Sequence, residues 1–457
     1  MLTKATSYKL IHRNYFHKNI PSSVRTMVAD EFFINLNQTN KITPSCMILF
    51  INFFILILSV IISLTPWNSN PSILFPLSHY QVIKVCCLVV GGGMSKIRLM
   101  LLSSGLVFLV LLLKCVGDTD SDHAGNVITW DDFMVDEKDT TSNVGGRVIV
   151  VDQSGNGDST TVQAAVDMVP QNNTQRVKIY IYPGIYRERV HVPKSKPFIS
   201  LIGKPNITTN ANIAAIGNGI GIVIITNSTK ASDKDSNGQE MGTISTATVW
   251  VQSDFFCATA LTIQNLVDKD ADKRQAVALR VDGDKAVFYG VRLVGEQDTL
   301  LDNTGIHYFY RSYIQGSVDF IFGNAKSLFH ECVVYSVAEF WGAIAAHHRD
   351  SEDEDTGFSF VNCTIKGSGS VFLGRAWGNY ATTIYSNCDM DDVINPLGWS
   401  DWGDPSRQGT AMFGEYECSG KGSNRSERVE WSKALSREEA EPFLSTDYIY
   451  GDGWLRL

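Results

Sequence analysis

The sequence lacks the signatures of several common classes of enzyme and binding protein. It contains no G-x-S-x-G motif, which argues against the serine mechanism of an α/β-hydrolase. His347 and His348 precede an acidic run, but no second ligand cluster at metal spacing accompanies them, so we interpret them as part of a solvated loop and expect no metal site. The net charge is −9 rather than basic, and nucleic-acid binding is therefore not expected.

Long helical periodicity is also scarce, the clearest exceptions being residues 162–169 and 436–443. From about residue 147 to the end, the chain is a series of short β-branched and aromatic runs punctuated by Gly, Asn and Asp, which is typical of strands and turns. A stretch of this length is within the range of one all-β unit. The sequence therefore predicts an all-β domain over 147–457, with a few short helices at its ends.

The segment before this domain contains two apolar runs. Residues 47–64 carry no charge and are long enough to span a bilayer, whereas residues 94–117 have the basic start, apolar core and small terminal residues of a secretory signal peptide. We expect Met94 to be the true start and residues 1–93 to belong to an over-extended reading frame; the alternative is a membrane anchor at 47–64. Residues 118–146 are acidic and polar, and are predicted to form a flexible leader.

Several runs in the domain share a template, an aromatic residue followed five places later by an aliphatic one. The intervals between the aromatic residues are 32, 21, 20, 31 and 25. A repeated unit of this length favours a parallel β-helix, in which inward side chains of one coil stack on those of the next. A β-sandwich is the alternative, but uneven intervals fit a solenoid with loops inserted on one face. The aromatic residues are Phe256, Phe288, Phe309, Phe329, Phe360 and Tyr385.

Two carboxylates, Asp298 and Asp319, lie 21 residues apart in apolar surroundings, where an unpaired charge is costly to bury. Gln275 lies 22 residues before Gln297, which directly precedes Asp298. If a short coil has 21 or 22 residues, Gln275, Gln297 and Asp319 fall on adjacent coils with Asp298 beside them. One carboxyl group would then stay protonated and the other ionised, and the amides could hold an oxyanion. The alternative is that each Asp caps a turn.

The segment 370–380 supplies Arg375, which can hold an ionised Asp by a bidentate contact. It also supplies Trp377, which either stacks on a sugar ring or packs against the wall of the solenoid.

At this point the motifs are recognisable, and together they resemble those of plant pectinesterases of the short, single-domain class, without an inhibitor-like pro-region. They occur in the family's order and span nearly all of 147–457. They are GIYRE (184–188), QAVALR (275–280), GEQDTL (295–300), GSVDFIFG (316–323) and LGRAW (373–377).

The resemblance implies a right-handed, single-stranded parallel β-helix of the pectin lyase-like kind. It also implies hydrolysis of the galacturonate methyl esters of pectin, without metal or cofactor. By motif, Asp319 would be the nucleophile and Asp298 the proton donor and later the base. Gln275 and Gln297 would form the oxyanion hole, with Gln275 also contacting substrate, and Arg375 would orient Asp319 and bind substrate.

The resemblance assigns further substrate contacts to Trp377 and Thr243. The family usually has an aromatic residue after the position of Thr243, where this chain has Ile244. Residues 211–225 are apolar and contain glycine, and we interpret them as an insertion that is either a gene-model artefact or a disturbance of an early coil.

Cys332 and Cys363 occupy one template position on successive repeats and match a disulfide that family members often have, so we expect that bond; Cys388, one repeat later, could compete for Cys363. We further expect a secreted, glycosylated monomer of the plant cell wall whose partner is methyl-esterified homogalacturonan, with a proteinaceous inhibitor as a second partner. The rivals are a pectin lyase or polygalacturonase, whose motif sets are not apparent, and a catalytically silent pectin-binding wall protein.

Overall fold

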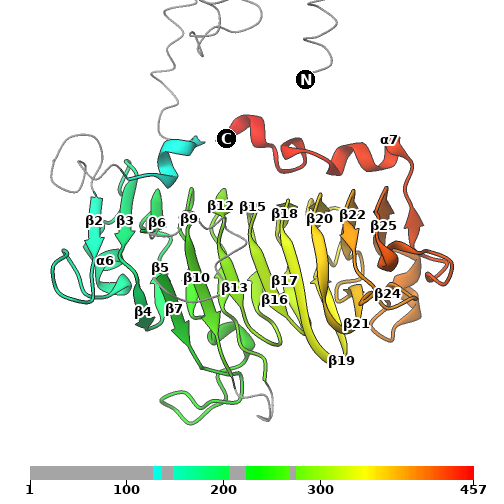
Figure 1. The fold of residues 1–457 in the computed structure, drawn as a ribbon, viewed down its shortest axis with the longest axis horizontal. Helices are drawn as coiled ribbons and strands as arrows, with labels where there is room; N and C mark the ends of the chain where they lie inside the picture. The colour runs from blue at the N-terminus through cyan, green and yellow to red at the C-terminus, as the bar shows by residue number, and fades with distance from the viewer. Residues whose placement is uncertain (1–126, 136–147, 205–222, 268–273) are drawn as a thin grey trace, which may run out of the picture. The chain divides into compact units, whose positions relative to one another are not determined.

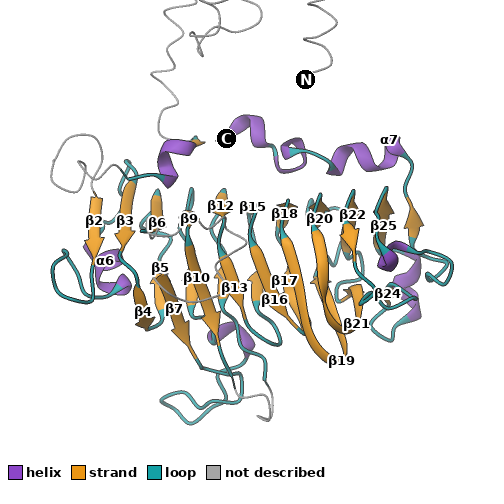
Figure 2. Ribbon diagram, in the orientation of Figure 1, coloured by secondary structure: helices purple, strands orange, loops and turns teal. Residues whose placement is uncertain are grey.

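The structure, a computed structural model, describes residues 127–135, 148–204, 223–267 and 274–457. These residues form a parallel β-helix, as expected (Figures 1 and 2). The chain passes in turn through three sheets, here called sheets I, II and III, and each new strand pairs in parallel with the strand one coil earlier. The segments 1–93 and 94–117, and the apolar run 47–64, lie outside the described residues. No helix in the described ranges is long and apolar enough to cross a membrane.

Each sheet runs the length of the β-helix. Sheet I contains β2 (Val148–Val151), β3 (Val177–Ile181), β6 (Ile199–Gly203), β9 (Cys257–Thr259), β12 (Ala286–Tyr289), β15 (Ile306–Tyr310), β18 (Lys326–His330), β20 (Gly357–Val361), β22 (Thr382–Ser386), β25 (Met412–Tyr416) and β26 (Lys433–Ala434). Sheet II contains β4 (Gly184–Arg187), β7 (Val223–Asn227), β10 (Leu261–Asn265), β13 (Arg292–Val294), β16 (Tyr313–Gly316) and β23 (Asp389–Met390). Sheet III contains β5 (Val190–Val192), β8 (Val249–Val251), β11 (Leu279–Val281), β14 (Leu300–Asp302), β17 (Val318–Gly323) and β24 (Trp399–Ser400). Two long strands, β19 (Val333–His347) and β21 (Thr364–Ala376), run through sheets II and III.

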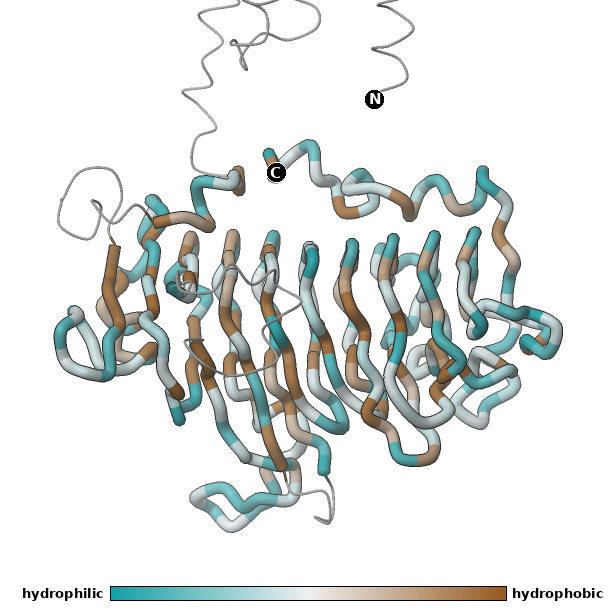
Figure 3. Tube along the Cα trace, viewed as in Figure 1, coloured by the Kyte–Doolittle hydropathy of each residue, from teal (hydrophilic) through white to brown (hydrophobic). Residues whose placement is uncertain are grey.

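An aromatic ladder fills the core behind sheet I. Rings on successive coils stack nearly in parallel, with centroids 4.4–4.8 Å apart from Phe288 to Tyr385. Phe256 differs from the template, because Ala258 and not Phe256 pairs with Phe288, and the Phe256 ring contacts Phe288 at a tilt of 45°. The hydropathy of the chain follows the same arrangement, with apolar residues recurring along the strands and polar ones at the turns (Figure 3).

A sharp corner divides several of the expected runs into two strands. Residues 286–294, 307–314 and 327–334 are each a continuous β-prone run in the sequence, but Gly290, Arg311 and Glu331 have φ values of 61°, 50° and 54° and turn the chain from sheet I to sheet II. A positive φ lets one residue make this corner, at a cost that side chains other than Gly, Asn and Asp rarely accept. Because the corner residues have no common side-chain type, the sequence pattern does not reveal the break.

The cysteines at the shared template position form a column on successive coils. Cys332, Cys363 and Cys388 directly precede paired residues of β19, β21 and β23 and are buried as free thiols. The thiols of Cys332 and Cys363 contact the backbone carbonyl oxygens of Phe309 and Phe329, each at 3.3 Å. The expected Cys332–Cys363 bond stays a prediction.

Segments near both ends of the domain cover the outer face of sheet I. The expected leader is partly ordered, because β1 (Ile128–Thr129) pairs with β27 (Leu455–Arg456) and η1 (Trp130–Phe133) packs against Tyr289. Residues 127–135 therefore belong to the folded domain and not to a flexible leader, since Ile128 and Phe133 are buried in a cluster with residues of the sheet and the C-terminal segment. The remaining helices are α6 (Val162–Met168), η3 (Thr243–Ser245), η4 (Pro405–Gly409), η5 (Lys421–Ser423), α7 (Arg437–Ala440), η6 (Glu441–Phe443), η7 (Thr446–Ile449) and η8 (Gly451–Gly453).

The end of the expected insertion is part of the solenoid. Residues 223–225 begin β7, which pairs with β4 on one side and β10 on the other. Val223 and Ile225 are fully buried, so these three residues are a core strand and not inserted sequence. Residues 211–222 lie outside the described residues.

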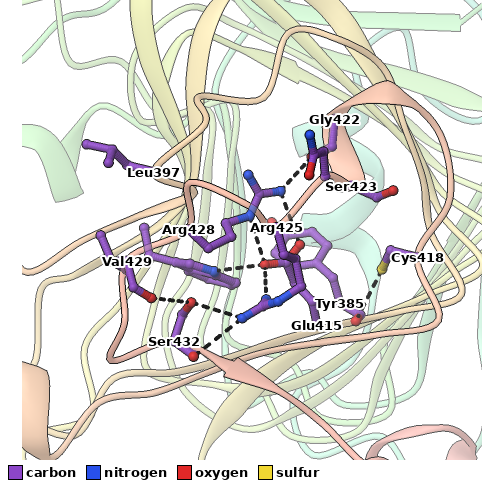
Figure 4. A network of polar contacts seen from close by, with 12 residues as sticks. Tyr385, Leu397, Glu415, Cys418, Gly422, Ser423, Arg425, Arg428, Val429 and Ser432 are labelled. Atoms are coloured by element: carbon purple, nitrogen blue, oxygen red, sulfur yellow. Dashed lines mark hydrogen bonds and ion pairs between the residues drawn. The ribbon is translucent and has the colours of Figure 1, made fainter.

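A buried charge network ends the aromatic ladder. Glu415 occupies the ladder position next to Tyr385, and its carboxylate accepts hydrogen bonds from Arg425, from the Trp399 indole at 3.3 Å and from Arg428 at 3.0 and 3.2 Å (Figure 4). The side chains of Glu415 and Arg428 are 3% and 2% exposed. Charges this deeply buried are tolerated only because they are paired and hydrogen-bonded.

We therefore predict that Arg428→Met destabilises the protein by about 3–5 kcal/mol, because Glu415 would keep only part of its compensation in a buried site. Denaturant unfolding measures the change. Arg311→Met is the control, since its ion pair with Glu331 is half exposed and should contribute less than about 1 kcal/mol. Equal losses in the two variants would contradict the interpretation.

Candidate active site

The four expected catalytic residues lie on three successive coils, where the chain turns from sheet II into sheet III. Gln275 pairs with Gln297, and Gln297 pairs with Val318. Asp298 and Asp319 follow Gln297 and Val318, so the two carboxylates are in register on adjacent coils. The structure therefore brings together the four residues that the spacing argument named, although it is Asp298, rather than Gln297, that lies opposite Asp319.

Both aspartates have an unusual backbone conformation. Their φ values are 65° and 48°, and the ladder between β17 and β19 shifts register between Val318 and Ile321. An irregularity of this kind re-aims a side chain out of the regular pleat. Gly316 permits the close turn before Asp319, because a Cβ there would lie 2.2 Å from the Cβ of Phe320.

Asp319 is held by Arg375, which lies on β21. The guanidinium donates two hydrogen bonds to the carboxylate, one from Nε to Oδ1 at 2.9 Å and one from Nη2 to Oδ2. Burial raises the pKa of Asp319, while Arg375 acts in the opposite direction by stabilising the carboxylate.

Asp298 has no such cation as a hydrogen-bond partner among the described residues. Burial and the adjacent charge of Asp319 raise the pKa of Asp298 well above its usual value, and only the more distant charge of Arg375 lowers it. When two neighbouring carboxyl groups share one proton, the proton resides on the group whose negative charge is less stabilised by a cation or by hydrogen bonds. The physical causes of these shifts therefore favour the proton on Asp298 and the negative charge on Asp319.

The two glutamines lie at the edge of this pair. Gln275 and Gln297 are both half-buried, and the amide oxygen of Gln275 is buried without a hydrogen-bond partner among the described residues. A buried amide without a partner is unusual in a protein, and it leaves polar capacity that a bound group can use.

An apolar strip follows the outer face of sheet III beside the carboxylates. Leu301, Phe322 and Ala346 form it, and Trp377 packs against it with its ring centroid 6.1 Å from that of Phe322. His348 also packs against Trp377, with the two ring centroids 4.2 Å apart. Trp377 is half-buried, so it is both packed against the wall and partly open to a ligand.

Thr243 begins η3 and is tied to the coil of Gln275 through two contacts. Its carbonyl oxygen accepts a hydrogen bond from the Thr246 hydroxyl at 2.7 Å, and that hydroxyl accepts one from the backbone N–H of Val277 at 2.9 Å. Ile244 is 55% exposed beside it. The structure thus places Thr243 near the glutamine end of the site, without a recorded contact to either carboxylate.

Two tryptophans near Arg375 were missed from the sequence. The ring centroid of Trp402 lies 3.9 Å from Arg375 Cζ, and that of Trp341 lies 5.7 Å away. Arg375 pairs with Ser400, so Trp402 lies two residues beyond one full coil after Arg375, and the interval could have revealed it. Trp341 sits in an irregular corner, and no regular interval indicates its position.

Of the two adjacent histidines, only His348 lies in the loop that was expected, where its side chain is 38% exposed. His347 ends β19 and is fully buried, and its Nδ1 accepts a hydrogen bond from the backbone N–H of Thr382 at 3.1 Å. Burial lowers its pKa to about 3, so it is neutral at physiological pH. His348 instead packs on Trp377. No group of three or more metal-ligating side chains is found in the described part of the chain.

The Pectinesterase family model matches residues 148–452. The chain belongs to the pectinesterase family. It is 61% identical over 313 residues to pectinesterase QRT1 of Arabidopsis thaliana, an alignment that covers 68% of this chain and 79% of the relative. The resemblance inferred from the motifs is therefore confirmed.

Solved structures agree with this assignment. The carrot pectin methylesterase superposes with a TM-score of 0.60 at 32% identity, covering 68% of this chain and 96% of the carrot chain. The Aspergillus niger pectin methylesterase gives 0.57 at 28% identity, over 69% and 98%. The β-helix is thus the fold expected for this pectinesterase.

We predict that Asp298→Asn stabilises this pectinesterase at pH 7 by about 1–2 kcal/mol. Because the folded-state pKa of Asp298 is raised, the native carboxyl group keeps its proton after the unfolded one has lost it, and stability is lost as pH rises above about 4. The advantage of Asn over Asp should therefore grow from pH 4 to pH 7 in denaturant unfolding. Asp353→Asn, at an exposed position, is the control and should show no such trend. An advantage independent of pH would contradict the assignment of the proton.

Proposed function

We propose that this chain hydrolyses the methyl esters of galacturonate in pectin, releasing methanol and leaving de-esterified pectin. The observation that carries the proposal is the pair of buried carboxylates in register, of which only Asp319 is held by an arginine. Family membership supports the same reaction.

In the first half of the reaction, the carboxylate of Asp319 attacks the ester carbonyl carbon. The carbonyl electron pair moves to its oxygen, where the side-chain N–H groups of Gln275 and Gln297 stabilise the negative charge. As the tetrahedral intermediate collapses, the bond to the methoxy oxygen breaks and Asp298 donates its proton, so methanol leaves. The product of this half is an anhydride between Asp319 and the galacturonate.

In the second half, Asp298 is ionised and accepts a proton from water. The resulting hydroxide oxygen attacks the galacturonate carbonyl of the anhydride, and the carboxylate of Asp319 leaves. The cycle returns Asp298 to its protonated state and Asp319 to its ionised state. No metal or cofactor takes part.

Three further residues position the substrate. Arg375 keeps Asp319 ionised and fixes the plane of its carboxylate through two parallel hydrogen bonds. Trp377 presents the open part of its ring to a sugar, and Thr243 contacts the chain at the glutamine end.

We place this activity in the plant cell wall, on methyl-esterified homogalacturonan, after secretion directed by residues 94–117. A monomer suffices, because the described domain contains the whole catalytic set, and a proteinaceous inhibitor is a further partner. De-esterified pectin is a polyanion, and with a net charge of −9 the enzyme should hold this product weakly.

The deciding experiment is methanol release from highly methylated pectin by the purified protein and by Asp319→Ala. We expect release by the parent and a loss of at least about 10³-fold in the variant, because the nucleophile is absent. Asp353→Asn serves as the control, since that carboxylate is exposed and should leave the rate unchanged. Equal release by parent and Asp319→Ala would remove Asp319 as nucleophile. Absence of release by the folded parent would favour the silent pectin-binding protein instead.

The pH profile gives a second prediction. The acid limb of kcat/KM should report ionisation of Asp319, and Arg375→Gln should move that limb to higher pH, because removing the cation removes what lowers the pKa of Asp319. The same variant should lose about 10²-fold or more in kcat/KM at pH 7. An unshifted acid limb would show that Arg375 acts on the substrate alone.

A further inference from the structure

An aromatic pair protrudes from the β-helix on the coil next to that of the proposed nucleophile. Phe340 is 82% exposed and Trp341 is 55% exposed, in strand β19, where the chain turns from sheet II to sheet III. We call these two residues the aromatic corner. Rings this exposed contribute little to the core, and an exposed apolar patch beside a catalytic site commonly contacts a ligand.

The corner is built as a bulge. Val337 pairs with Ser368 and Trp341 with Ser370, so residues 338–340 stand opposite Gly369 alone. Serine side chains hold the bulge. The Ser336 hydroxyl donates to the carbonyl oxygen of Ser368 at 2.8 Å, and the Ser368 hydroxyl donates to that of Ala338 at 2.9 Å. A bulge fixed on both strands presents its side chains in a defined place.

The direction of Trp341 connects the corner to the catalytic pair. Its ring centroid lies 5.7 Å from Cζ of Arg375, whose guanidinium binds the carboxylate of Asp319. On the backbone, Ala343 pairs with Val318, the residue before Asp319. The aromatic corner therefore lies on the coil that follows Asp319, beside the guanidinium that binds this carboxylate.

We propose that the aromatic corner binds a methyl-esterified galacturonate next to the one being hydrolysed, and so makes the enzyme prefer runs of esters. The proposal rests on the proposed function. Aromatic faces suit the C–H face of a sugar and its ester methyl group, whereas a free carboxylate against them would lose hydration without a partner.

The charges around the corner act in the same direction. Glu339, directly before the pair, is exposed and repels a free galacturonate. Arg375 is the nearby cation, but its guanidinium is already engaged by both oxygens of Asp319 and leaves little attraction for a second carboxylate. An ester is therefore favoured over an acid at this position.

The test compares the full-length parent with Phe340→Ala/Trp341→Ala on two pectins of equal chain length, one highly methylated and one mostly de-esterified, at equal ester concentration. On the highly methylated pectin we expect KM to rise about fivefold or more with kcat within about twofold. On the mostly de-esterified pectin, where neighbouring esters are rare, KM should change by less than about twofold. Ile185→Ala, an exposed apolar residue on β4, is the control and should match the parent on both.

An unchanged KM on both pectins would overturn the proposal, and the aromatic corner would then be interpreted as a contact for a protein partner. An equal rise on both would overturn the preference for esters. The unfolding midpoint should not move, because both side chains are exposed. Failure of the proposed function is distinguishable, because the parent itself would then release no methanol from either pectin.

Discussion

The stacking of each coil on the one before it is the constraint on which the rest of the structure depends. In a parallel β-helix, a residue's neighbours are the residues one coil away, at the spacing of paired strands. The same rule produces the aromatic ladder, the cysteine column and the pair of facing carboxylates. A site built in this way needs no long-range loop to assemble it, because positions 21 or 22 residues apart become neighbours once the coils form.

The active site lies where this regular stacking is interrupted. On successive coils, paired residues mark the start and the end of the turn from sheet II to sheet III. The chain advances by four residues from 275 to 279, by three from 297 to 300 and from 318 to 321, and by two from 343 to 345. The turn between the two sheets therefore shortens from one coil to the next across the site, and Asp298 and Asp319 both adopt positive φ there. Strained backbone and buried carboxylates are destabilising, and the continuous core beneath them offsets the cost.

The stacking rule also explains what could be foreseen from the sequence. Intervals between residues indicated the β-helix, its ladder and the convergence of Gln275, Gln297, Asp298 and Asp319. This is possible because the length of a coil equals the number of residues between two stacked positions. The corners were not foreseeable, because one residue in the left-handed region makes each turn and Arg, Glu and Gly all serve. The ordered part of the leader was missed for a different reason, since its partner lies at the other end of the domain, more than 300 residues away.

The chemistry depends on giving two neighbouring carboxylates unequal surroundings, and the repeat itself would make them alike. Asp298 and Asp319 occupy equivalent places on successive coils, with similar backbone and similar burial. Arg375, on β21, breaks the equivalence. Its guanidinium donates a hydrogen bond to each carboxylate oxygen of Asp319, and none to Asp298 among the hydrogen bonds of the described residues. In the proposed mechanism, this one arginine decides which carboxylate attacks and which holds the proton. Because the adjacent charge of Asp319 raises the pKa of Asp298, the basicity of Asp298 in turn depends on whether Asp319 is ionised.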